Sequence, residues 1–114
     1  MKHRCILAII CSLAVVSILQ PRPALAVVEG GDSEHGRQLG IELCLPCHVQ
    51  GAEAGTMRPI SKTQRQWERF FQKDRHAKIA PGTWEGITEQ QLKDILQFLY
   101  DHAADSDEPA VWER

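Results

Sequence analysis

The chain has 114 residues and a formal net charge of −2, with 43% hydrophobic and 25% charged residues. This length fits one small domain, and the acidic balance argues against nucleic-acid binding, which needs a basic surface. The charge is also uneven, because basic residues gather between Arg58 and Lys78 whereas acidic residues crowd the end of the chain.

The first 26 residues have the order of a secretory signal peptide. A basic start, Met1–Arg4, precedes the apolar run Cys5–Leu19, two prolines and the small-residue site Ala24–Ala26. The apolar run is shorter than the roughly 20 residues that a membrane-spanning helix needs, although an uncleaved anchor is the alternative. We therefore expect cleavage after Ala26 and a periplasmic or otherwise exported domain, residues 27–114, without a membrane span. Its net charge is −5, because three basic residues leave with the signal and no acidic ones do.

A first helix is predicted from Glu34 to about Cys47, with Ser33 as its N-cap. Gly36 and Gly40 lie four residues apart and so share one face of this helix. Each glycine costs about 1 kcal/mol relative to alanine inside a helix. Two glycines on one face therefore indicate that another element packs closely there, and a weak, frayed helix is the alternative.

A second helix follows a loop over residues 49–61, which contains glycines and a proline but no apolar period. Thr63 and Gln66 form a capping box that opens a helix from Gln64 to about Arg75. The helix carries an aromatic stripe that we expect to face the core: Trp67, Phe70 and Phe71.

The third helix has the strongest apolar pattern. A capping box of Thr88 and Gln91 opens it, and it should run to about Ala104. Its apolar face consists of Leu92, Ile95, Leu96 and Leu99, with Phe98 beside them. The acidic tail, residues 105–114, is expected to be loosely ordered. The sequence contains no convincing strand, so the predicted class is all-α with three helices.

Two cysteines, Cys44 and Cys47, remain after the signal peptide, within the sequence Cys-Leu-Pro-Cys-His that ends at His48. This is the attachment pattern of a c-type haem. Two thiols three positions apart on one helical turn can reach both vinyl groups of a porphyrin edge, and the histidine then lies under the iron. A redox-active dithiol would normally open a helix after a strand, and a zinc site would need a fourth ligand.

With this motif, the chain resembles the class I c-type cytochromes over nearly all of residues 27–114. Gly36-Arg37-Gln38-Leu39 is similar to the first helix of that family, and Leu96-Gln97-Phe98-Leu99 is similar to its closing helix. The resemblance implies three helices around one covalent haem c, with His48 as an iron ligand. It also implies a contact between Gly36 and Phe98.

The resemblance implies further haem contacts. In the family, a proline soon after the motif offers its carbonyl group to the proximal histidine, and Pro59 has the matching position. Trp67 and Trp84 each have an indole N–H for which a haem propionate is a suitable acceptor, although packing alone would also account for them.

The sixth iron ligand departs from the family pattern. Most relatives supply a methionine shortly before the closing helix, where this chain has Ala80-Pro81. Bis-histidine c-type cytochromes instead have a histidine after a tryptophan-containing helix, and His76 is similar in position. Met57, Lys78 and an open iron site are the alternatives.

The resemblance implies electron transfer by a haem protein that is not itself an enzyme, either a soluble shuttle or the haem subunit of a larger exported oxidoreductase. Its partners would be redox proteins, membrane-bound or periplasmic. Two histidine ligands should give a lower reduction potential than histidine with methionine. A small-ligand binder or sensor with a displaceable sixth ligand is the alternative function.

Arg65, Arg69 and Lys73 project together from the second helix, either as solvated side chains or as a docking patch for an acidic partner.

Overall fold

The structure is a computed structural model that describes residues 29–112, so the predicted signal peptide lies outside the described residues. The helical elements, in chain order, are α1 (Ser33–Leu39), a π-helical turn (Gly40–Cys44), a 3₁₀ turn (Pro59–Ser61), α2 (Gln64–Gln72), α3 (Arg75–Ile79) and α4 (Glu89–Asp101). No strand occurs in this part of the chain, so the predicted all-α class is confirmed, with four α-helices instead of three. Over the same residues, no helix combines the length and apolar character that crossing a bilayer requires.

Helix α1 begins one residue before its predicted start. The carboxylate of Asp32, and not the side chain of Ser33, accepts the backbone N–H of His35 at 2.9 Å and caps the helix. At Gly40 the helix widens into the π-helical turn, where the N–H of Leu45 donates to the carbonyl of Gly40 at 3.1 Å. The predicted continuous helix is therefore an α-helix followed by a wider turn that leads into the cysteine motif.

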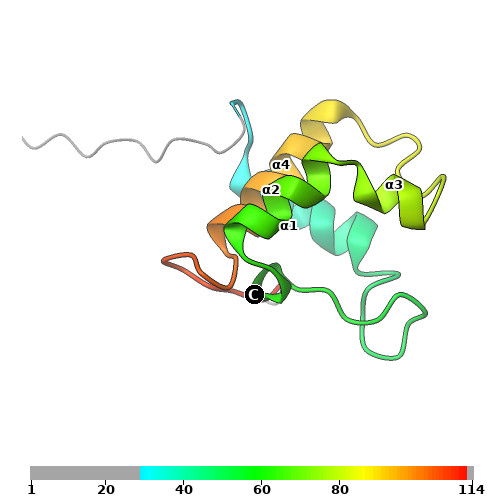
Figure 1. The fold of residues 1–114 in the computed structure, drawn as a ribbon, viewed down its shortest axis with the longest axis horizontal. Helices are drawn as coiled ribbons and strands as arrows, with labels where there is room; N and C mark the ends of the chain where they lie inside the picture. Colours follow the sequence, from blue (N-terminus) through cyan, green and yellow to red (C-terminus); the bar gives the residue numbers. More distant parts are fainter. Residues whose placement is uncertain (1–28, 113–114) are drawn as a thin grey trace, which may run out of the picture.

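The predicted second helix corresponds to α2 but ends three residues early, at Gln72, and a further short helix, α3, begins at Arg75. The capping box of α2 is present, since the N–H of Gln66 donates to Oγ1 of Thr63 at 3.3 Å and the N–H of Thr63 donates to Oε1 of Gln66 at 2.9 Å. The break occurs at Asp74, whose φ of 47° and ψ of 45° are left-handed, a conformation that aspartate tolerates better than most residues. In Figure 1, α3 lies to one side of the group formed by α1, α2 and α4.

Helix α4 packs against both α1 and α2 and supplies half of the buried hydrophobic core. The predicted box of Thr88 and Gln91 opens it, and it ends at Asp101 rather than near Ala104. The buried core consists of Leu39, Trp67, Ile95, Leu96, Phe98, Leu99, Ala103 and Trp112.

Both glycines of the first helix are places of close approach, as predicted. A Cβ atom on Gly36 would overlap the backbone carbonyl of Asp94 on α4. The nearest atoms to this position belong to Asp94 and Ile95, and not to Phe98 as the resemblance implied. At Gly40 the neighbour is the indole ring of Trp112, which a Cβ atom would also overlap.

Trp112 differs from the expectation of a loosely ordered tail. It is 3% exposed, and its ring stacks on Phe98 with the ring centroids 5.1 Å apart. Its indole N–H donates to the carbonyl of Met57 at 2.8 Å. The hollow beside Gly40 gives the indole an apolar site, so this part of the acidic segment belongs to the core.

Candidate functional site

The cysteine motif forms one helical turn. The N–H groups of Cys47 and His48 donate to the carbonyl of Cys44, at 3.2 and 3.1 Å. Cys44 and His48 are half-buried, and Cys47 is exposed. The two thiols and the imidazole therefore project from a single turn, as attachment to one porphyrin edge requires.

The Cys44 thiol does not have the properties of a reactive thiolate. Burial, and then the neighbouring Cys47, raise the pKa of Cys44 to about 11, so this thiol stays protonated at neutral pH. A redox-active dithiol attacks through a cysteine with a lowered pKa, so Cys44 would not be the attacking thiol of such a pair. As for a zinc centre, no three His, Cys, Asp or Glu side chains among residues 29–112 are placed to hold a metal ion.

A backbone carbonyl supports His48, but it does not belong to the expected residue. Nδ1 of His48 lies 3.3 Å from the carbonyl oxygen of Gly55, to which it can donate. The carbonyl of Pro59 instead accepts the indole N–H of Trp67 at 2.7 Å. This bond engages both the Pro59 carbonyl, which was expected to accept from His48, and the Trp67 N–H, for which a haem propionate was the expected acceptor. Gly55 approaches His48 because the loop turns back on itself, with the N–H of Met57 donating to the His48 carbonyl at 3.1 Å.

His76 is held by the turn that follows α3. The hydroxyl of Thr83 donates its only proton to the carbonyl of Ala80 at 2.7 Å, so it must accept from Nδ1–H of His76, at 2.9 Å. This bond selects the tautomer in which Nε2 carries a free lone pair. The indole of Trp84 stacks on the imidazole with the centroids 4.8 Å apart and the planes 8° from parallel. No pattern in the sequence pointed to Thr83, which lies between the second and third predicted helices.

The electrostatic setting of His76 favours the neutral imidazole. Burial, and then the electrostatic effect of the neighbouring His48, lower the pKa of His76, and the opposing effect of Asp74 is smaller. Neutral imidazole is the form that binds metals. The side chain is therefore oriented, stacked and uncharged.

His48 and His76 lie next to each other although α2 separates them in sequence. Their ring centroids are 6.2 Å apart and their planes differ by 62°. Two imidazoles that each bind one metal ion through a nitrogen at about 2 Å can have their centroids roughly 6 Å apart. Ordinary edge-to-face packing covers the same range. Each Nδ1 has a partner, and neither Nε2 has a hydrogen bond within the described part of the chain, so both Nε2 atoms are available to bind a metal ion.

Comparison with models of protein families, with curated proteins and with solved structures gave no match for this chain. What the chain does is therefore inferred from its own residues.

Aromatic side chains lie around His76. Phe70 lies 6.3 Å from His76 and 6.1 Å from Trp67, both edge to face. Phe71 stacks on Trp84 with the centroids 5.3 Å apart. The aromatic stripe of α2 thus faces the His76 side of the site. A planar apolar group with a central metal ion would suit both these walls and the two imidazoles.

The other candidate ligands lie elsewhere or have other partners. Met57 packs half-buried against the core, with its backbone bonded to His48 and Trp112. Lys78 is exposed. His35 bonds Asp94 at 2.7 Å, and His102 bonds the Glu108 carbonyl at 2.7 Å.

Proposed function

We propose that this chain is a monohaem c-type cytochrome that transfers electrons, similar to class I but with two histidine ligands. Cys44 and Cys47 would hold the haem by thioether bonds, and His48 and His76 would bind its iron. The observation that supports this best is the histidine pair, with both Nδ1 atoms engaged and the ring centroids 6.2 Å apart. When bound, the haem iron supplies a one-electron couple that no protein side chain here provides.

The surrounding residues would set the properties of the site. The Gly55 carbonyl and the Thr83 hydroxyl accept the Nδ1 protons, which orients both imidazoles and makes them stronger donors. Stronger nitrogen donors favour the oxidised ion, so the reduction potential should lie below that of methionine-ligated relatives. Phe70, Trp84 and, behind them, Trp67 would shield the site from water. We further propose export to the periplasm and a redox protein as partner.

The direct test is maturation. Expression in the periplasm together with a haem-attachment system should yield coloured protein whose mass exceeds that of the mature chain by one haem, and the haem should resist acid–acetone extraction. Replacing both cysteines by alanine should abolish the attachment. The spectrum of the unchanged protein should be six-coordinate and low-spin. Colourless protein of apoprotein mass would refute the proposal.

A second function, a haem-based ligand binder, has one observation in its favour. His76 lies on the five-residue helix α3, which begins after the left-handed residue Asp74. Such a backbone conformation costs about 1 kcal/mol or more, and a short helix gains little stability of its own. A ligand held in this way could be displaced by carbon monoxide. Reduced protein whose spectrum changes rapidly under carbon monoxide would favour the sensor, and an unchanged spectrum favours the electron carrier.

A further inference from the structure

Among the described residues, lysine and arginine side chains on α1 and α4 have carboxylate partners, whereas those on and around α2 and α3 have none. On α1, Arg37 pairs with Glu34 at 3.1 Å, and on α4, Lys93 pairs with Glu89 at 3.0 Å. By contrast, no carboxylate of residues 29–112 lies within 4.0 Å of the charged nitrogens of the basic residues on and around α2 and α3. Those residues are Arg58, Lys62, Arg65, Arg69, Lys73, Arg75 and Lys78.

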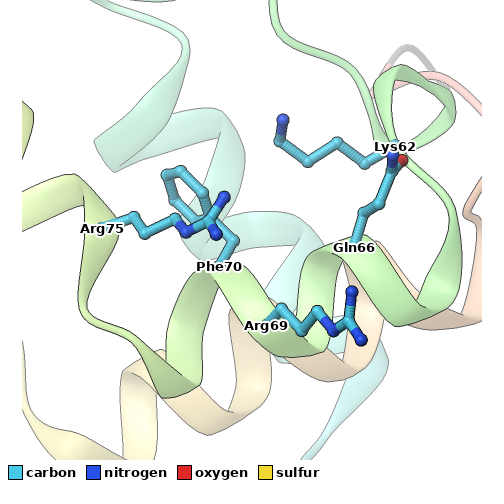
Figure 2. Close-up of a pocket in the computed structure, with 5 residues that line it drawn as sticks. All are labelled: Lys62, Gln66, Arg69, Phe70 and Arg75. Carbon is cyan, nitrogen blue, oxygen red and sulfur yellow. The ribbon is translucent and has the colours of Figure 1, made fainter.

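Three of these uncompensated cations line one open pocket of about 240 Å³, which we call the cationic pocket. Its lining consists of Lys62, Gln66, Arg69, Phe70 and Arg75. Figure 2 shows the side chains of Lys62 and Arg75 extending toward the Phe70 ring from opposite sides, whereas the guanidinium group of Arg69 points away from the ring. Nζ of Lys62 lies 5.5 Å from the Phe70 centroid. The pocket therefore offers two converging cations above an aromatic floor.

The floor of this pocket is also a wall of the histidine site. Phe70 contacts His76 edge to face, with the centroids 6.3 Å apart. A molecule bound in the cationic pocket would thus be separated from His76 by a single aromatic ring. A short separation matters for a redox protein, because electron transfer slows steeply as the distance between centres increases.

We propose that the cationic pocket binds a carboxylate group on the surface of an acidic redox partner, so that electrons pass at the face of α2 and α3. This inference rests on the proposed electron transfer. A lysine and an arginine that lack partners can each form charge-assisted hydrogen bonds with a carboxylate. Complementary charge would also raise the rate of encounter, although the mature chain is acidic overall.

The sign of a salt effect tests the proposal in the haem-loaded protein. The probe is ferricyanide, a small anionic oxidant, mixed with the reduced protein in a stopped-flow instrument at increasing ionic strength. If the net negative charge of the haem-loaded protein governed the encounter, screening of the repulsion would make oxidation faster with salt. If ferricyanide reacts at the cationic pocket, screening of the attraction makes it slower. We expect a decrease of roughly threefold to tenfold between 10 and 200 mM salt.

Matched variants locate the effect. Lys62→Gln and Arg75→Gln each remove one positive charge from the pocket, and together they should flatten or reverse the salt dependence. Arg37→Gln removes one charge from α1, where the arginine lies beside exposed Glu34, and should leave the slope unchanged. The compared quantity is the slope of the oxidation rate against ionic strength. A variant that changes the reduction potential alters the rate at every salt concentration but leaves this slope unchanged.

Two results would overturn the proposal. In the first, oxidation of the unchanged protein accelerates with salt, or Arg37→Gln alters the slope as much as the pocket variants do. In the second, the pocket variants shift the reduction potential but leave the salt slope as it was, which would assign the pocket to the haem's own carboxylates. In either case a low-spin spectrum of the same samples would leave the proposed electron transfer standing.

Discussion

The Thr83 hydroxyl holds His76 in one tautomer, because the hydroxyl donates its proton to the carbonyl of Ala80 and can only accept from Nδ1–H of His76. Replacing Thr83 by valine keeps the shape of the side chain but removes the acceptor for Nδ1–H. The imidazole then becomes a weaker donor, so the reduction potential should rise and cyanide should replace His76 about tenfold faster. Redox titration and stopped-flow cyanide binding measure the two effects. Thr83→Ser retains the hydroxyl and should behave like the unchanged protein. Equal behaviour of both variants would contradict the role of the hydrogen bond.

Replacing His76 by alanine should convert six-coordinate low-spin haem into a high-spin or water-ligated form that binds carbon monoxide readily. The reason is the loss of the only neutral imidazole that lies against His48 in the described structure. Absorption spectra of oxidised and reduced protein, before and after carbon monoxide, measure the change. His102→Ala is the matched control, since that ring bonds the Glu108 carbonyl and packs on Phe98. A low-spin spectrum that survives in His76→Ala would assign the sixth position to another residue.

Gly36→Ala should destabilise the fold by about 1–3 kcal/mol, because the new methyl group would overlap a backbone carbonyl that cannot rotate away. The carbonyl belongs to Asp94, so the clash forces α1 and α4 apart. Chemical denaturation of the haem-loaded protein gives the free energy of unfolding. Gln38→Ala shortens an exposed side chain of the same helix to a methyl group, and helix propensity predicts a change within about 0.5 kcal/mol.

Gly40 and Trp112 should be strongly coupled, because the indole occupies the space that a side chain at position 40 needs. Trp112→Ala alone should cost about 3–5 kcal/mol of unfolding free energy through lost burial. Gly40→Ala alone should also destabilise. In the Trp112→Ala background, however, the same change should be neutral or stabilising by up to about 1 kcal/mol, since alanine favours the helix and finds room. A double-mutant cycle measures this, and simple additivity would contradict the packing.

Acid should weaken the contact between α1 and α4 through Asp94. Burial raises the pKa of this carboxyl, but hydrogen bonds from the backbone of Asp32 (2.9 Å), from His35 (2.7 Å) and from Gln90 (2.8 Å) outweigh it, so the net pKa is lowered. A carboxyl with a lowered folded-state pKa stabilises the fold above its unfolded pKa of about 3.9, and the stabilisation is lost as the pH falls further.

The measurement is the free energy of unfolding between pH 7 and pH 2. Asp94→Asn should be less stable at neutral pH and should lose less stability below about pH 4 than the unchanged protein, so the two curves converge in acid. Glu53→Gln, on an exposed loop residue, serves as the control. Parallel curves for Asp94→Asn and the unchanged protein would show that the buried carboxylate contributes no pH dependence.

Local signals predicted much of the fold. The boxes at Thr63 and Thr88 and the apolar face of α4 depend on neighbouring residues alone, and the structure has them where the sequence placed them. The glycine spacing in the first helix correctly indicated close packing. Asp74 shows where this reasoning fails. The sequence predicted that the helix continues to about Arg75, but the backbone of Asp74 is left-handed and α2 ends before it, at Gln72.

Features that depend on tertiary contacts were not predictable in detail. The sequence placed a carbonyl beside His48 but could not distinguish Gly55 from Pro59, because that choice depends on how the loop closes and on the competing indole of Trp67. The proximity of His76 to His48 followed only from the family resemblance. The burial of Trp112 could not be predicted, because it depends on the space beside Gly40, and the acidic tail has no apolar period that indicates packing.

The position of Trp112 determines when, during synthesis, the packing next to the cysteine pair can form. Because this indole fills the space beside Gly40, directly before the turn that carries Cys44, the packing there cannot close until the chain has been synthesised through residue 112. A growing or translocating chain therefore presents its cysteine pair while the neighbouring packing is still open. The thiols would be accessible to an attachment enzyme during that interval, before the last tryptophan docks.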